Sequence, residues 1–141
     1  MARDDKSNDP TLAAIAAKSE KESAYHIRHS SEWIVRLGDG TEESHRRAQI
    51  AIDDLWAYTG EMFAIDDSER GLIDAGIAID PASLRAQWLK TVSEVVSEAT
   101  LSLPKGEWMQ QGGRSGRHSE HLGHLLSELQ SMQRTFPGAT W

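Results

Sequence analysis

Apolar residues recur every three or four positions in four separate stretches of the chain, which is the period of an amphipathic helix. In the third stretch the apolar positions are Leu84, Trp88, Val92, Val95 and Ala99. No stretch alternates apolar and polar residues in the way that a half-buried strand does. The pattern predicts helices over residues 10–37, 42–64, 82–100 and 117–135. The sequence therefore predicts an all-α protein.

Local signals support these boundaries. Asp-Pro pairs at residues 9–10 and 80–81 place an N-cap side chain directly before a proline, which is favoured as the first residue of a helix. We expect a loop over residues 101–116 and a connector with one short helical turn over residues 65–80. Since 141 residues is an ordinary size for one domain, we expect a single domain over residues 1–141.

Charge, hydropathy and the absence of cysteine argue against several classes of function. The chain has 22 acidic and 15 basic side chains, a formal net charge of −7, whereas a nucleic-acid surface needs concentrated Lys and Arg. No apolar run approaches the roughly 18 residues of a membrane-spanning helix, and no signal-peptide pattern opens the chain. We therefore expect a cytoplasmic protein with no nucleic-acid or membrane partner. Because cysteine is absent, only His, Asp and Glu could serve as metal ligands.

Histidines and carboxylates gather near the C-terminus. His121, His124 and Glu128 share one flank of the predicted helix as an i, i+3, i+7 set, so a metal face of two or three ligands is one interpretation. We favour hydrogen bonding or partner contact, because three ligands from one helix rarely close a site. His118 falls on the apolar stripe around Leu129, which favours packing or capping over metal binding.

The first predicted helix offers a second candidate cluster, made of Glu22, Tyr25, His26 and His29. Ferritin-like di-iron bundles use Glu-x-x-His to bring a carboxylate and an imidazole to one metal. Here Tyr25 stands at the third position and His26 comes one residue late, rotated by roughly 100°. We expect an inward polar cluster and no iron site. The neighbouring apolar stripe of this helix is formed by Ile15, Trp33 and Leu37.

Five segments of the chain together resemble a known family. They read "DPTLAAIAAKSEKESAYHIRHSSEWIVRLGDGT", "LWAYTGEMF", "GIAIDPASLRAQW", "EATLSLP" and "HSEHLGHLLSELQSMQRTFPGATW". They closely resemble the C subunits of bacterial phenylacetyl-CoA epoxidase, also called phenylacetate-CoA oxygenase. The resemblance runs from about residue 9 to residue 141, and residues 118–141 are its most specific part.

The resemblance implies a ferritin-like helical bundle within a multicomponent enzyme. Such an enzyme uses oxygen and reducing equivalents to epoxidise the aromatic ring of phenylacetyl-CoA in aerobic phenylacetate catabolism. Its A subunit carries the di-iron centre and binds the CoA substrate, and its C subunit has lost the iron ligands and acts as a scaffold. The resemblance therefore implies that this chain has no catalytic residue and no cofactor of its own. The implied partners are the catalytic A subunit and the other subunits of the complex.

The resemblance also assigns helix docking and contact between subunits to a C-terminal signature. Its residues are His118, Glu120, His121, Gly123, Glu128, Gln133, Pro137 and Trp141. Family members are longer than this chain, which resembles their later half, so we expect a partial bundle without the family's first helices.

Two alternatives stay open. The first is a metal-binding helical bundle of the di-iron carboxylate type, for which the candidate ligands are Glu22, His26, His121 and Glu128. The second is a truncated remnant without function.

Overall fold

The structure is a computed structural model that describes residues 7–106 and 108–140. All the regular structure of these residues is helical, with no strand, which confirms the predicted all-α class. No helix within the described ranges is long and apolar enough to cross a membrane. The chain divides into two compact units between Gln110 and Gln111, and each unit is described by itself. The expectation of a single domain stays a prediction.

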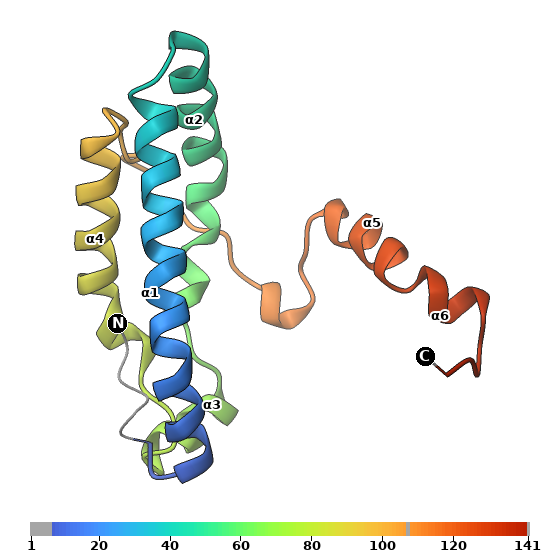
Figure 1. Cartoon of the computed structure of the whole chain (residues 1–141). Helices are drawn as coiled ribbons and strands as arrows, with labels where there is room; N and C mark the ends of the chain where they lie inside the picture. Colours follow the sequence, from blue (N-terminus) through green and yellow to red (C-terminus); the bar gives the residue numbers. More distant parts are fainter. Residues whose placement is uncertain (1–6, 107, 141) are drawn as a thin grey trace. The chain divides into compact units, whose positions relative to one another are not determined.

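The first unit is built on three helices, α1, α2 and α4, which run alongside one another (Figure 1). Helix α1 contacts both of the others. A fourth, short helix, α3, lies in the connector between α2 and α4. The α-helices of this unit are α1 (Pro10–Gly38), α2 (Glu42–Leu55), α3 (Asp67–Asp74) and α4 (Arg85–Glu98), and its 3-10 turns are η2 (Trp56–Tyr58), η3 (Gly60–Phe63) and η4 (Pro81–Leu84).

Side-chain caps start α1 and the turn η4, as the sequence indicates. The Asp9 carboxylate accepts hydrogen bonds from the backbone N–H groups of Thr11 and Leu12, at 2.8 and 3.1 Å, with Pro10 as the first helical residue. Asp80 caps the Ala82 N–H at 2.9 Å in the same manner. The second Asp-Pro pair opens the turn η4, however, and α4 itself begins only at Arg85.

Helix α2 ends at Leu55, so the predicted helix over residues 42–64 was wrong in its second half. The chain continues as the tighter turns η2 and η3. Two contacts explain the change. The backbone N–H of Gln110 donates to the Ala57 carbonyl oxygen at 2.8 Å, and Met109 packs so closely on Gly60 that an added Cβ would lie 2.9 Å from the Met109 Cβ. Both contacts come from a segment far along the sequence.

The connector contains more helix than the one turn expected. Helix α3 is eight residues long and begins with a reciprocal capping box. The Asp66 carboxylate accepts from the Glu69 N–H at 2.9 Å, and the Glu69 carboxylate accepts from the Asp66 N–H at 3.1 Å. The spacing Asp-x-x-Glu is a sequence signal for a helix start, and it could have predicted this helix.

A small core lies where the end of α4 meets α1. Val96, Ala99 and Leu101 are buried, with exposed fractions of 7%, 0% and 6%. Helix α4 closes with bonds from the Thr100 N–H to the Ser97 carbonyl and from the Leu101 N–H to the Val96 carbonyl, which is the Schellman pattern. These bonds turn the chain so that Leu101 packs back on Val96.

The second unit contains a 3-10 turn, η5 (Gly113–Ser115), and two helices, α5 (Glu120–Leu129) and α6 (Ser131–Thr135). The predicted single helix over residues 117–135 was therefore wrong at its start and in its continuity. Gly112 and Gly116 adopt φ values of +98° and +83°, and the Arg117 N–H donates to the Gly112 carbonyl at 2.8 Å. This turn holds the chain out of helical geometry until Ser119, the N-cap of α5.

Candidate functional site

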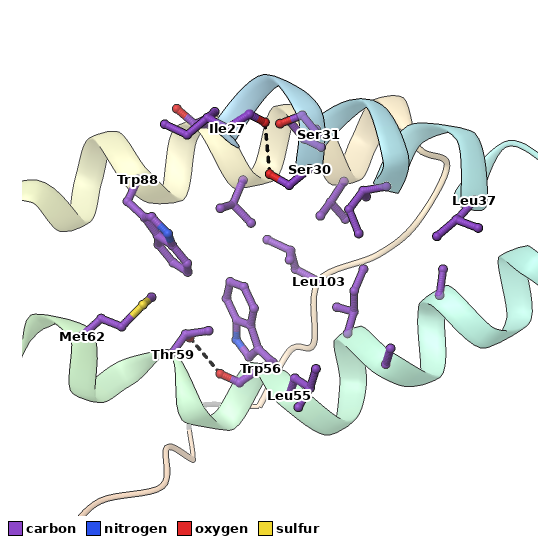
Figure 2. Close-up of a pocket in the computed structure, with 18 of the residues that line it drawn as sticks. Ile27, Ser30, Ser31, Leu37, Leu55, Trp56, Thr59, Met62, Trp88 and Leu103 are labelled. Atoms are coloured by element: carbon purple, nitrogen blue, oxygen red, sulfur yellow. Dashed lines mark hydrogen bonds between the residues drawn. The ribbon is translucent and has the colours of Figure 1, made fainter. Parts of the chain in front are cut away.

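The first unit contains an apolar cavity of about 1100 Å³ bordered by α1, α2 and α4. Figure 2 shows α1 and α4 along one side and α2 with its following turns along the other. Leu103, from the segment after α4, projects between the two sides. Gln49 of α2 holds this segment by exchanging two hydrogen bonds with the Ser102 backbone, each 2.9 Å long.

Aromatic side chains form one part of the cavity wall. Trp56 stacks on Trp88 with ring centroids 5.7 Å apart and planes 25° apart. Phe63 meets the Trp88 ring edge-on at 5.2 Å. Trp56 belongs to η2 and Phe63 to η3, so the break after Leu55 places both rings against α4. The predicted helix over residues 42–64 included both residues and had no such break.

Several hydroxyl groups of the cavity wall donate to backbone carbonyl oxygens of their own helix or turn. The Ser30 Oγ donates to the His26 carbonyl oxygen at 2.8 Å, and the Thr59 Oγ1 donates to the Trp56 carbonyl oxygen at 2.8 Å (Figure 2 draws both residues). A wall whose hydroxyl donors are already used in this way suits apolar side chains better than a polar substrate. Most residues of the cavity wall are apolar, and Glu43 and Arg47 are its charged members.

The inward face of α1 differs from the predicted one. Ile27 and Ile34 line the cavity, whereas Ile15 and Trp33 are not among its lining residues. Leu37 lines the cavity and is 41% exposed. The spacing of seven residues between Ile27 and Ile34 was a usable signal. The helix is apolar on two sides, and periodicity alone does not say which side packs inside.

Glu22 and His26, two of the four candidate ligands, lie on the surface of α1. The Glu22 Oε1 is 3.7 Å from the His26 Nε2, and the side chains are 78% and 65% exposed. The prediction that these residues form an inward polar cluster was therefore wrong. Tyr25 stacks on His29 with centroids 5.9 Å apart, and it occupies the position that a Glu-x-x-His motif would give to an imidazole. These residues do not fit a di-iron centre of that type.

The other two candidates, His121 and Glu128, are exposed on α5 in the second unit. Among the residues with described positions, no three His, Asp or Glu side chains form a group that could hold a metal ion. Glu22 and His26 belong to the first unit, and His121 and Glu128 belong to the second.

The C-terminal signature is spread along the second unit. His118 lies before α5, so it is not on the apolar stripe of that helix, and the reason is the glycine-bounded turn at η5. Glu120 and Gly123 are exposed on α5, and Gln133 is exposed on α6. Pro137 occupies a tight turn in which the Ala139 N–H donates to the Phe136 carbonyl at 3.2 Å, with Gly138 at φ +84°. Trp141 lies outside the described residues.

Comparisons with known proteins give one consistent result. Residues 2–141 match the family described as phenylacetic acid catabolic protein. The chain is 47% identical over 135 residues to the C subunit of the 1,2-phenylacetyl-CoA epoxidase of Escherichia coli strain K12. The aligned region covers 96% of this chain and 54% of that relative, so the chain spans about half the length of the curated relative it matches.

Proposed function

The chain belongs to the phenylacetic acid catabolic protein family, and from this membership we propose that it acts in phenylacetate catabolism as a noncatalytic structural subunit of a phenylacetyl-CoA epoxidase. The family has a ferritin-like helical fold. The proposed role is to support the catalytic A subunit, which carries the di-iron centre. The observation that carries the proposal is the 47% identity to a C subunit over 96% of the chain.

The apolar cavity supports a structural role. Its walls include Ile27, Leu55 and Met62, which are 47%, 63% and 49% exposed. An apolar surface of this kind is typical of a protein that packs against another. Three of the hydroxyl groups that line it, on Ser30, Thr59 and Thr91, donate to their own helix or turn, and most of the other lining residues are apolar, which supports a role in packing.

The chemistry of the candidate ligands supports the assignment of the iron to the partner. Glu22 and His26 form an exposed pair, and Tyr25 breaks the Glu-x-x-His spacing. We also propose that the signature residues of the second unit, His118 and His121 among them, contact the partner protein.

The test is to combine the purified chain with the A subunit of the same epoxidase and a reductase system. We expect the two chains to co-purify through size-exclusion chromatography, and we expect epoxide formation from phenylacetyl-CoA only when the A subunit is present. Metal analysis of the separated chains checks where iron resides. Epoxide formed by this chain and the reductase alone, or about two irons per chain, contradicts the proposal. Absence of co-purification also contradicts it.

A further inference from the structure

Met109 and Gln110 hold the two 3-10 turns that follow α2. The Met109 side chain packs on Gly60 of η3, where a Cβ added to Gly60 would lie 2.9 Å from the Met109 Cβ, 3.0 Å from its Cγ and 3.3 Å from its Sδ. The next residue, Gln110, donates its N–H to the Ala57 carbonyl oxygen of η2 at 2.8 Å. The packing and the hydrogen bond therefore depend on the placement of one short segment.

The sequence of these turns favours a longer helix than the structure contains. Its apolar period predicts a helix over residues 42–64. In a continuous α-helix, the Ala57 carbonyl oxygen would accept from the N–H of Glu61, four residues further on. In the structure this carbonyl accepts from Gln110. Two conformations thus compete for residues 56–63, and the distant segment selects the 3-10 turns.

The Met109 side chain borders a small pocket beside these turns. The pocket has a volume of about 370 Å³, and Trp56, Phe63 and Trp88 form part of its wall. Met109 is half-buried, and hydrogen peroxide is little larger than the water molecules that such a pocket admits. Thiolates and thioethers are the side-chain groups most susceptible to oxidation, and the chain has no cysteine. A peroxide that enters the pocket therefore meets a reactive sulfur.

We propose that Met109 is a modification site, at which oxidation to the sulfoxide by hydrogen peroxide releases residues 109–110 from η2 and η3. The Met109 Sδ attacks one peroxide oxygen, so that an S–O bond forms as the O–O bond breaks. The other oxygen leaves as water with both peroxide hydrogens. The electron pair that reduces the peroxide comes from the sulfur, so the step needs no further reactant.

Oxidation removes the reason for Met109 to stay on Gly60. It converts a flexible apolar side chain into a polar one, and this change disrupts apolar packing. The contact with Gly60 is already tight, so it has no room for an added oxygen. The oxidised side chain turns to water, and the neighbouring Gln110 loses its bond to Ala57. Helix α2 then continues through residues 56–63, which adds about two helical turns.

This change alters the aromatic part of the cavity wall. Trp56 is carried by η2 and Phe63 by η3, and their ring centroids lie 5.7 and 5.2 Å from that of Trp88 (Figure 2 shows Trp56 and Trp88). A 3-10 turn and an α-helix differ in rise and in rotation per residue, so both rings move relative to α4 when the turns become helical. Oxidation of Met109 thus regulates the shape of the cavity. The inference does not depend on the proposed function.

The experiment treats the whole chain with hydrogen peroxide and identifies by peptide mass spectrometry which methionines gain oxygen. Hydrogen exchange of the same samples reports on the two conformations. After oxidation we expect the Gln110 amide to exchange about tenfold faster or more, because its hydrogen bond is lost. We expect the amides of residues 56–63 to exchange more slowly, because they enter a helix. Methionine sulfoxide reductase should restore both rates.

Three variants make the test specific to Met109. Met109→Leu keeps an apolar side chain without sulfur, and we expect peroxide to leave its exchange unchanged. The matched control Met132→Leu removes a methionine that is 52% exposed on α6, and it should respond like the unchanged chain. Gly60→Ala places a methyl group 2.9 Å from the Met109 Cβ, so we expect fast exchange of Gln110 without any oxidant.

Several results overturn the inference. The first is a Met109 that gains no oxygen under conditions that oxidise Met132. The second is unaltered exchange of Gln110 after Met109 is oxidised, or in Gly60→Ala. The third is an equal response to peroxide in Met109→Leu, since another residue then causes the change. A cooperative loss of the helical circular dichroism signal on oxidation also overturns it, because the unit then unfolds instead of changing locally.

Discussion

At the scale of single residues, Gly38, the last residue of α1, packs tightly against Ala99, at the end of α4. A Cβ added to Gly38 would overlap the Ala99 carbonyl oxygen and would lie 2.8 Å from the Ala99 Cβ. Thr100 follows with φ +61°, an unusual conformation for a β-branched residue. Its hydroxyl donates to the Gly38 carbonyl at 3.3 Å, which helps to hold that conformation.

The substitution Gly38→Ala is expected to lower the free energy of unfolding by about 1–3 kcal/mol, because the methyl group must displace the backbone of α4. Urea denaturation followed by circular dichroism measures the change. The matched control is Gly71→Ala in α3, where an added Cβ meets nothing within 4 Å. There we expect no loss, and a gain of up to about 1 kcal/mol from helix propensity. Equal stability of Gly38→Ala and the unchanged chain would show that the two helices do not meet as described.

At the scale of elements, α5 is a short amphipathic helix that leaves its leucines open. Leu125 and Leu129 are 55% and 69% exposed, and the helix stops after ten residues at Gln130. The Gln130 N–H bonds to both the Leu126 and Glu128 carbonyl oxygens, so the last turn tightens before α6 begins. A helix of this length is marginal in water without packing, which favours a partner for the second unit.

The double substitution His118→Gln/His121→Gln is expected to weaken association with the A subunit by about 1–3 kcal/mol, the usual cost of an unsatisfied polar partner at an interface. Both side chains are exposed, so helicity in the circular dichroism spectrum should not change. The control is His26→Gln, the same chemical change at an exposed histidine on α1, outside the signature. Full association of the double variant, together with loss of a bound metal, would favour the metal interpretation of α5 over docking.

At the scale of the whole molecule, few side chains are fully removed from water. Among the described hydrophobic residues only Val96, Ala99 and Leu101 reach the buried class, and Ile34, Val35 and Ile52 are only partly buried around them. Hydrophobic stabilisation grows with the apolar area removed from water. A chain with so small a core gains stability when a partner covers its apolar surfaces.

The free chain is therefore expected to bind the apolar dye 1-anilinonaphthalene-8-sulfonate at the open cavity, and the A subunit is expected to displace it. A titration of dye fluorescence measures both steps, with the chain unfolded in guanidinium chloride as the control for unspecific binding. At a partner concentration about one hundred times Kd, the chain gains about 2.7 kcal/mol of stability. A free chain that does not enhance dye fluorescence would mean that the cavity is closed in solution.

Much of the cavity wall could not be predicted from the sequence. The stripe on α4 containing Trp88 and Val92 was predicted, and both residues line the cavity. The meeting of Trp56 with Trp88 was not, because it depends on the break after Leu55. Leu103 was assigned to a loop without a role, and only its tie through Ser102 to Gln49 brings it into the cavity.

The sequence by itself determined where α1 and α2 begin and that the described chain is helical. Caps such as Asp9 and Thr41 bond to backbone groups two or three residues away, and the apolar period repeats within each helix. Both signals can therefore be recognised from a short stretch of sequence. The tertiary structure decided where α2 ends, because the donor to Ala57 is Gln110. It also decided that Ile34 rather than Trp33 faces inward, since a helix that is apolar on two sides is oriented only by contacts with distant residues.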